Sequence, residues 1–242
     1  MKGEWISDPK TASGDKVIYY LHGGGYISGS AKTGRPLTAP LARQMGVRIF
    51  SLDYRLAPEH HFPAGLDDAV AGYHWLLSKG IQPVNISVMG DSAGGGMTLA
   101  LALRLRDAGN TLPASLVCLS PWTDMTGNSK SIAANAGRDP MFVAEDIDRY
   151  ANAYLGSQSR IDPLTSPLLG NLAGLPPLLI QVGRNEVLLD DARSLHEKVR
   201  EARGSSELHV YEGVPHGWHF GAPFVPESRE ALREIAEFIA RQ

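Results

Sequence analysis

The most chemically informative segment of the sequence is 90–94 (GDSAG), where Ser92 stands between two glycines. An apolar run, 86–89, precedes this segment, and a long stretch of small and apolar residues, 95–105, follows it. The pattern predicts a buried strand, a sharp turn with the serine at its tip, and a helix, which is the arrangement of a nucleophile elbow. Glycines are required because such a turn strains the backbone and leaves no room for neighbouring side chains. Ser92 is therefore a candidate nucleophile.

A serine nucleophile needs a base that removes its proton, and along chains with this elbow the order is serine, acid, histidine. His216 directly follows the last predicted strand, 208–211, and is the expected base. His219, three residues further on, is the alternative. A metal site made from these two histidines is not favoured, because no third ligand stands at a recognisable spacing. The sequence therefore predicts neither a metal nor a cofactor.

The acid that orients the base should follow the predicted strand at 178–182. Glu186 lies four residues beyond that strand, in a loop. Asp190 and Asp191 begin the next predicted helix, where an acidic residue is ordinary capping chemistry. We therefore favour Glu186 as the acid and keep Asp190 as the alternative.

Donors for an oxyanion have two sources in this sequence. One is the backbone N–H of Ala93, the residue after the candidate nucleophile, and the other is the glycine run in 22–25 (HGGG), which follows the predicted strand at 16–21. Consecutive glycines let the backbone approach a ligand closely. A phosphate cradle is disfavoured, because neither glycine cluster completes G-x-G-x-x-G and no G-K-[ST] is present.

Composition narrows the class of protein. The 242 residues suit one α/β domain spanning 1–242, with an apolar fraction of 43% and a charged fraction of 20%, and the net charge of −3 with mixed signs gives no nucleic-acid footprint. Cys118 is the sequence's single cysteine, so no intrachain disulfide can form. The polar segment 1–10 lacks the apolar core of a signal peptide, and no apolar run approaches the ~20 residues that a membrane span needs. We expect a cytoplasmic protein without a membrane span.

Short apolar runs alternate with helical patterns along the chain, which predicts a mostly parallel central sheet with helices on both faces. Ligands on such sheets bind at the carboxyl ends of the strands, where the candidate residues above all lie. The segment 125–170 breaks the rhythm and is interpreted as an insertion with one clear helix. The expected strands are 4–7, 16–21, 47–52, 86–89, 116–119, 178–182 and 208–211, and the other expected helices are 36–45, 65–78, 95–105, 190–203 and 227–241.

Six segments in one order carry a family resemblance: YLHGGGY (20–26), DYRLAPEHHFPA (53–64), GDSAGG (90–95), SPWTD (120–124), the stretch 182–191 and VPHGW (214–218). The chain resembles the hormone-sensitive-lipase-like branch of the α/β-hydrolases, the microbial family IV carboxylesterases. The resemblance implies the α/β-hydrolase fold and hydrolysis of esters with small acyl groups. It also implies a nucleophile at Ser92, oxyanion donors at Gly24, Gly25 and Ala93, and scaffold roles for Asp53 and Arg55.

The sequence departs from the family pattern in two places. Where the family usually has Asp in D-P-L-x-D, residues 186–190 read EVLLD, and Glu can do the same task. Family members usually have several dozen residues before HGGG, whereas this HGGG begins at residue 22. We therefore expect a reduced cap that lacks the usual N-terminal helices, with 125–170 as the cap-like insertion. This cap leaves the site more open, and a neighbouring subunit in a homodimer is one way to cover the exposed apolar surface.

The sequence thus predicts a serine carboxylesterase. It would hydrolyse small-molecule esters with short acyl chains through an acyl-enzyme intermediate. Tyr26, Trp122, Phe142 and Trp218 are the candidate substrate-binding residues. An amidase or sugar-ester deacetylase on the same triad is the alternative, because pocket shape decides between these substrates. A non-catalytic ligand-binding homologue is disfavoured, since such proteins are expected to lose a triad member and none is missing here.

Overall fold

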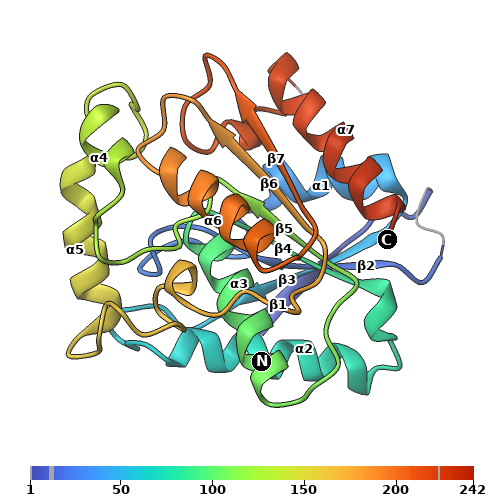
Figure 1. Ribbon diagram of the computed structural model, residues 1–242. Helices are drawn as coiled ribbons and strands as arrows, with labels where there is room; N and C mark the ends of the chain where they lie inside the picture. Colours follow the sequence, from blue (N-terminus) through green and yellow to red (C-terminus); the bar gives the residue numbers. More distant parts are fainter. Residues whose placement is uncertain (1, 11–13, 223) are drawn as a thin grey trace.

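The computed structural model describes residues 2–10, 14–222 and 224–242. In this part of the chain, seven strands form one sheet in the order β1-β3-β2-β4-β5-β6-β7 (Figure 1). The edge strand β1 runs antiparallel to β3, and every other neighbouring pair is parallel. The strands are β1 Lys2–Ile6, β2 Val17–Leu21, β3 Arg48–Asp53, β4 Ile86–Asp91, β5 Ser115–Leu119, β6 Leu178–Gly183 and β7 Ser206–Tyr211.

Helices cover both faces of the sheet, which is why the inner strands β2, β4, β5 and β6 are buried along their whole length and are mostly apolar. In β2, Ile18 and Tyr20 pack in one apolar cluster with α1 and α7, while Tyr19 and Leu21 pack in the other with α2, α3 and α6 (Figure 1). The helices are α1 Arg35–Met45, α2 Ala64–Ser78, α3 Ala93–Asp107, α4 Lys130–Ala134, α5 Ala144–Leu155, α6 Leu189–Glu201 and α7 Pro226–Ala240, with short 3-10 helices η1 Pro83–Asn85, η2 Pro167–Leu169 and η3 Trp218–Gly221.

The predicted strands and helices are present, with ends that shift by a few residues. The expected insertion runs between β5 and β6 and carries α4 and α5, which lie together at the left of Figure 1. The sequence predicted α5 but not α4, because a helix of five residues is too short to show a periodic pattern.

A buried carboxylate at the start of α6 ties the beginning of the insertion to the core. Asp191 Oδ2 accepts the N–H groups of Thr123 and Asp124 at 2.8 and 3.0 Å, and Oδ1 accepts the hydroxyl of Ser129. Burial raises the pKa of Asp191 to about 6, although these hydrogen bonds oppose the rise. The first residues of the insertion are therefore fixed to the frame that holds the sheet.

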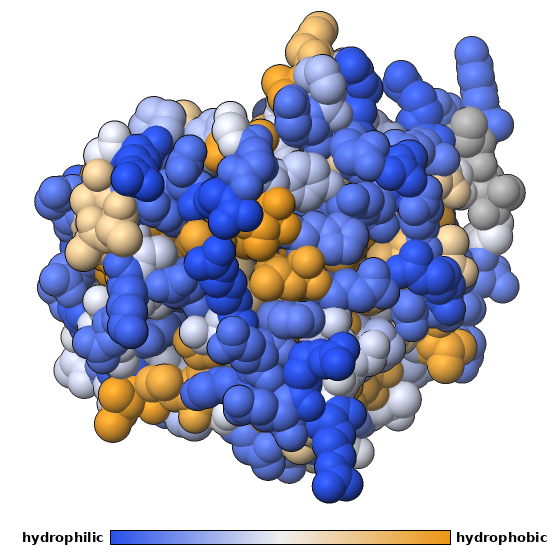
Figure 2. Space-filling model, turned by 45° about the horizontal axis from the view of Figure 1, so that its top comes forward, coloured by the Kyte–Doolittle hydropathy of each residue, from blue (hydrophilic) through white to orange (hydrophobic). Residues whose placement is uncertain are grey.

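The face of the molecule in Figure 2 is mostly polar, with apolar side chains gathered in separate patches. The large apolar side chains exposed in the described residues are Trp5, Val84, Met141, Val143, Ile161, Leu169 and Phe224. A homodimer that would cover apolar surface stays a prediction. No helix within the described ranges is long and apolar enough to cross a membrane.

Close backbone approach between β2, β4 and α3 positions the elbow. A Cβ added to Gly94 would lie 2.0 Å from the carbonyl oxygen of Leu21, and one added to Gly90 would lie 2.2 Å from the carbonyl oxygen of Gly94. Because both obstructing atoms are backbone atoms, they cannot turn away as a flexible side chain would. Only glycine fits at either position.

The substitution Gly94→Ala tests this constraint. We expect it to lower the free energy of unfolding by roughly 3 kcal/mol or more, because the methyl group overpacks against fixed backbone. Gly80→Ala is the matched control: Gly80 has a positive φ of 84° and no atom within 4 Å of an added Cβ, so it should cost only about 1–2 kcal/mol of backbone strain. Urea unfolding of both variants measures the difference, and equal costs would contradict the close-approach argument.

Candidate active site

Ser92 lies at the tip of a strained turn between β4 and α3. Its backbone angles are φ 53° and ψ −120°, a positive φ that residues other than glycine rarely adopt. The neighbouring backbone fixes this conformation, because the Ser92 N–H donates to the carbonyl of Leu119 at 2.8 Å and the Ser92 carbonyl accepts the N–H of Trp122 at 3.0 Å. The hydroxyl is thereby presented above the carboxyl end of β4.

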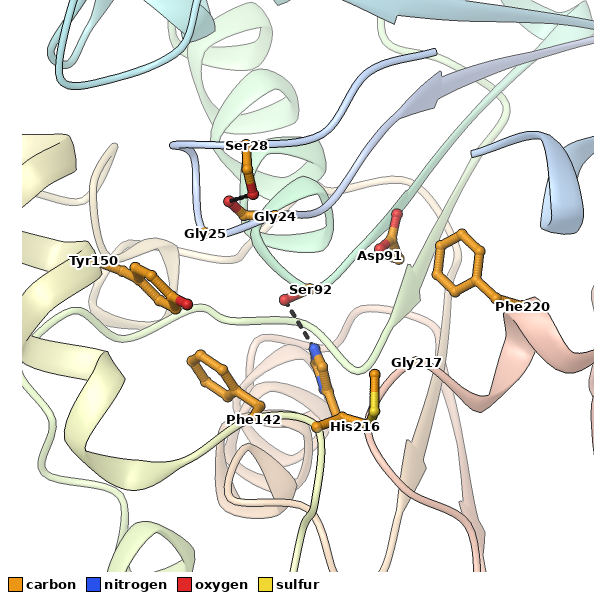
Figure 3. A pocket seen from close by; sticks show the side chains of 11 residues that line it. Gly24, Gly25, Ser28, Asp91, Ser92, Phe142, Tyr150, His216, Gly217 and Phe220 are labelled. Atoms are coloured by element: carbon orange, nitrogen blue, oxygen red, sulfur yellow. Dashed lines mark hydrogen bonds between the residues drawn. The ribbon is translucent and has the colours of Figure 1, made fainter. Parts of the chain in front are cut away.

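His216 lies between Ser92 and Glu186 and makes a hydrogen bond to each. The distance from His216 Nε2 to Ser92 Oγ is 3.0 Å (Figure 3). The distance from His216 Nδ1 to Glu186 Oε2 is 2.7 Å. An ionised carboxylate only accepts hydrogen bonds, so Nδ1 carries the proton and Nε2 is free to accept the serine hydroxyl. The three side chains therefore form one chain of hydrogen bonds in the order that acyl transfer requires.

Glu186 is held by donors that leave one oxygen for the histidine. The side chain is fully buried, and its Oε1 accepts the N–H of Gly183 at 2.6 Å and the hydroxyl of Ser120 at 2.8 Å. The alternative acid, Asp190, lies at the start of α6, where its Oδ2 accepts the N–H of Ser131 at 2.9 Å. The structure thus brings Glu186, and not Asp190, to His216.

The alternative base, His219, lies elsewhere. Its ring is fully buried, with Nε2 at 3.2 Å from Oε1 of Gln181. Burial, with a smaller contribution from the charge of His216, lowers the pKa of His219 to about 3. It stays neutral and makes no contact with Ser92.

The charges around His216 favour its protonated form. Burial lowers its pKa, but the hydrogen bond and charge of Glu186 raise it, and the charges of Asp139 and Asp91 add to that rise, so the net shift is upward. A raised pKa means that folding stabilises the imidazolium. This contribution to stability is fully present below the ordinary histidine pKa of about 6.5 and is lost as the pH rises through the folded-state pKa.

The glycine run forms a loop above Ser92. Gly24 and Gly25 have φ of 112° and 62°, and a Cβ on Gly24 would lie 2.3 Å from the carbonyl oxygen of Ser28. The loop is anchored to the elbow by Asp91, whose Oδ1 accepts the N–H of Gly23 at 2.9 Å and the hydroxyl of Tyr20. Burial raises the pKa of Asp91, and those two hydrogen bonds partly offset the rise.

Asp53 and Arg55, for which the resemblance implied scaffold roles, each contact another part of the chain. Asp53 Oδ1 accepts the N–H of Ala31 at 2.6 Å, and Arg55 pairs with Asp68 at 2.9 Å. Ala93 begins α3 directly after Ser92. The loop, the elbow and the base therefore meet at one edge of the sheet.

A cavity of about 350 Å³ opens over Ser92. Phe142 and Tyr150 from the insertion line one side of it, and Phe220 lies on the other side beside Asp91 (Figure 3). The complete lining is Gly24, Gly25, Ser28, Asp91, Ser92, Met141, Phe142, Tyr150, His216, Gly217 and Phe220.

Of the four aromatic residues predicted to bind substrate, only Phe142 lines this cavity. Tyr26 stacks on Tyr154 with ring centroids 3.9 Å apart. Trp122 is buried, and its indole N–H donates to the carbonyl of Asp124. Trp218 is buried against Tyr211, with centroids 5.1 Å apart. The sequence prediction is corrected for Tyr26, Trp122 and Trp218: these rings stabilise the core around the site.

Sequence reasoning missed Asp139, which lies in the insertion but contacts the histidine loop. Ligand-type atoms of Asp139, Glu186 and His216 all lie within 4.8 Å of one another, the one such group found in the described residues. A metal could in principle take such a set of donors. His216 Nδ1, however, already donates to Glu186, which is the arrangement of a proton-transfer site. No local sequence signal marks Asp139, because its partner is 77 residues away.

Comparison with known proteins agrees with this geometry. Residues 18–220 match the family described by the alpha/beta hydrolase fold. The crystal structure of an esterase from the bacterial hormone-sensitive lipase family is 47% identical with a TM-score of 0.97, over 99% of this chain and 80% of that one. The chain belongs to this family of α/β hydrolases. The family resemblance and fold predicted from the sequence are confirmed, and the family places this hydrolase among the carboxylic ester hydrolases.

Two further relatives extend the comparison. An acetyl-hydrolase of Streptomyces hygroscopicus is 40% identical over 236 residues, which are 98% of this chain and 78% of that protein. The crystal structure of EstE5 soaked with p-nitrophenyl butyrate has a chain that is 43% identical in sequence, with a TM-score of 0.94, over 98% of this α/β hydrolase and 80% of that chain.

The titration of His216 tests the two candidate acids against each other. We expect Glu186→Gln to lower the pKa of His216, because it removes the hydrogen-bonded charge that favours the imidazolium. Asp190→Asn is the matched control and should leave the pKa near its wild-type value. NMR of the histidine ring protons measures both, and a lowered pKa in Asp190→Asn alone would reverse the assignment.

Proposed function

We propose that this α/β hydrolase is a serine carboxylesterase that cleaves small, short-chain esters through an acyl-enzyme on Ser92. The observation that carries the proposal is the hydrogen-bonded chain from Ser92 through His216 to the buried Glu186, of which Ser92 and His216 line the cavity. A serine hydroxyl is a weak nucleophile until an adjacent base removes its proton, and this chain supplies the base and the group that orients it.

In the proposed first step, His216 Nε2 takes the Ser92 proton while Oγ attacks the ester carbonyl. The negative charge that develops on the carbonyl oxygen is stabilised by hydrogen bonds from the backbone N–H groups of Gly24, Gly25 and Ala93. His216 then protonates the departing alcohol, and Glu186 stabilises the imidazolium between these events. In the second step, His216 takes a proton from water as the water oxygen attacks the acyl carbon. His216 then returns this proton to Ser92 Oγ as the bond between Oγ and the acyl carbon breaks and the acid leaves.

The cavity supports a preference for short acyl chains. The Tyr150 ring packs against the glycine loop, with ring atoms 3.1 Å from the position of a Cβ on Gly25, and it stacks on Phe142 with centroids 6.0 Å apart. These rings belong to the segment 125–170, for which we propose the role of a partial cap. They limit the space beside Ser92, and the name of the acetyl-hydrolase and the p-nitrophenyl butyrate soaked into the EstE5 crystal fit the same preference.

The substitution Ser92→Ala tests the nucleophile. We expect turnover of p-nitrophenyl butyrate to fall about 10⁴-fold or more, because the variant has no oxygen to acylate. Covalent labelling by a fluorophosphonate probe should disappear together with turnover. Ser78→Ala, at the exposed end of α2, is the control and should label like the wild type. Labelling retained in Ser92→Ala would refute the proposal, and a wild type that never labels would favour a ligand-binding homologue.

The substitution Tyr150→Ala tests the limit on acyl length. We expect the ratio of kcat/KM for p-nitrophenyl octanoate to that for acetate to rise about tenfold, since each buried methylene contributes on the order of 1 kcal/mol. Tyr150→Phe keeps the ring and should keep the wild-type ratio. A chain-length series of p-nitrophenyl esters gives both values, and an unchanged ratio in Tyr150→Ala would contradict the role of this ring. Faster cleavage of matched anilides would favour the amidase alternative.

A further inference from the structure

Asp139 joins the insertion to the loop that carries His216. Its side chain is 2% exposed. Oδ1 accepts two backbone N–H groups, that of Met141 at 3.0 Å and that of His216 at 3.2 Å. The second bond crosses 77 residues of sequence and fixes the main chain of the histidine, while Glu186 and Ser92 contact only its ring.

The charge of Asp139 has few partners other than the histidine. Oδ2 is buried and has no hydrogen-bond partner in the described residues, and no lysine or arginine there forms an ion pair with Asp139. A nitrogen of His216 and an oxygen each of Asp139 and Glu186 lie within 4.8 Å of one another. Charges at such a distance interact strongly where water is excluded. The protonated ring of His216 is therefore the cation with which the Asp139 carboxylate interacts.

We propose that Asp139 is a positioning residue for His216, one that holds its main chain in place and whose buried carboxylate stabilises the imidazolium formed during acyl transfer. The proposal rests on the proposed function, because it takes His216 as the catalytic base. Asp139 acts through the histidine and transfers no proton itself.

Four titratable groups face His216 from the elements around it. Glu186 follows β6, Asp91 ends β4, Asp139 lies in the insertion and His219 is in η3. The three carboxylates favour the imidazolium, whereas His219 is neutral because burial lowers its pKa to about 3. Removal of the Asp139 charge therefore leaves two of the three carboxylates and should weaken, without abolishing, the stabilisation of the protonated ring.

The substitution Asp139→Asn keeps the size and the acceptor oxygen of the side chain and removes its charge. We expect kcat for p-nitrophenyl butyrate to fall on the order of tenfold with KM nearly unchanged, because the lost interaction is stronger in the transition state than with bound substrate. We also expect the acid limb of the pH–kcat profile to move to lower pH. Glu145→Gln, an exposed charge removal in the same insertion, is the matched control and should match the wild type.

An acid limb that coincides with that of the wild type would overturn the proposal, whatever happens to kcat, because a merely structural residue would leave the limb in place. Circular dichroism checks folding. If Asp139→Asn does not fold, the acid limb of the pH–kcat profile is measured for Asp139→Ser, which also removes the charge and keeps a hydrogen-bond acceptor. NMR titration of His216 decides the question independently of turnover. Failure of the proposed function would appear separately, as a wild-type protein that does not label at Ser92.

Discussion

The rest of the site depends on the close backbone packing that lets Ser92 adopt its strained conformation. A positive φ at a serine is costly, and it persists because the surrounding backbone over-determines it. Gly90 and Gly94 remove the atoms that would separate β2, β4 and α3, so the same packing that presents the hydroxyl also brings the glycine loop after β2 over it. The packing of β2, β4 and α3 therefore positions both Ser92 and the candidate oxyanion donors of the glycine loop.

Glu186 shows how hydrogen bonds stabilise a buried carboxylate. A carboxylate removed from water needs hydrogen-bond donors, and Glu186 has Gly183 and Ser120 on one oxygen and His216 on the other. The neutral donors fix the carboxylate before the histidine is charged, so little reorganisation is needed when the proton moves. The backbone of Glu186 is also held, because the Asn135 amide donates to the Glu186 carbonyl at 2.8 Å.

The sequence was sufficient for those parts of the fold and site that short segments encode. The strands, the elbow and the glycine loop were predictable because each depends on a few adjacent residues, and Glu186 could be preferred over Asp190 because helix starts have their own acid chemistry. Aromatic residues were less predictable: Trp122 and Trp218 follow strands as a pocket residue would, yet their rings turn into the core. A pattern shows that a ring is buried, and it does not show whether a ligand or the protein covers it.

The insertion explains why Tyr150 and Asp139 escaped prediction, although Phe142 in the same segment was predicted. Its irregular sequence has no period from which a buried face can be read, yet it supplies Phe142 and Tyr150 to the cavity wall and Asp139 to the histidine loop. Asp139 and Phe142 are three residues apart, and the intervening Met141 donates its N–H to the Asp139 carboxylate. Under the proposed function, one segment of the chain therefore both lines the cavity over Ser92 and holds the main chain of the base.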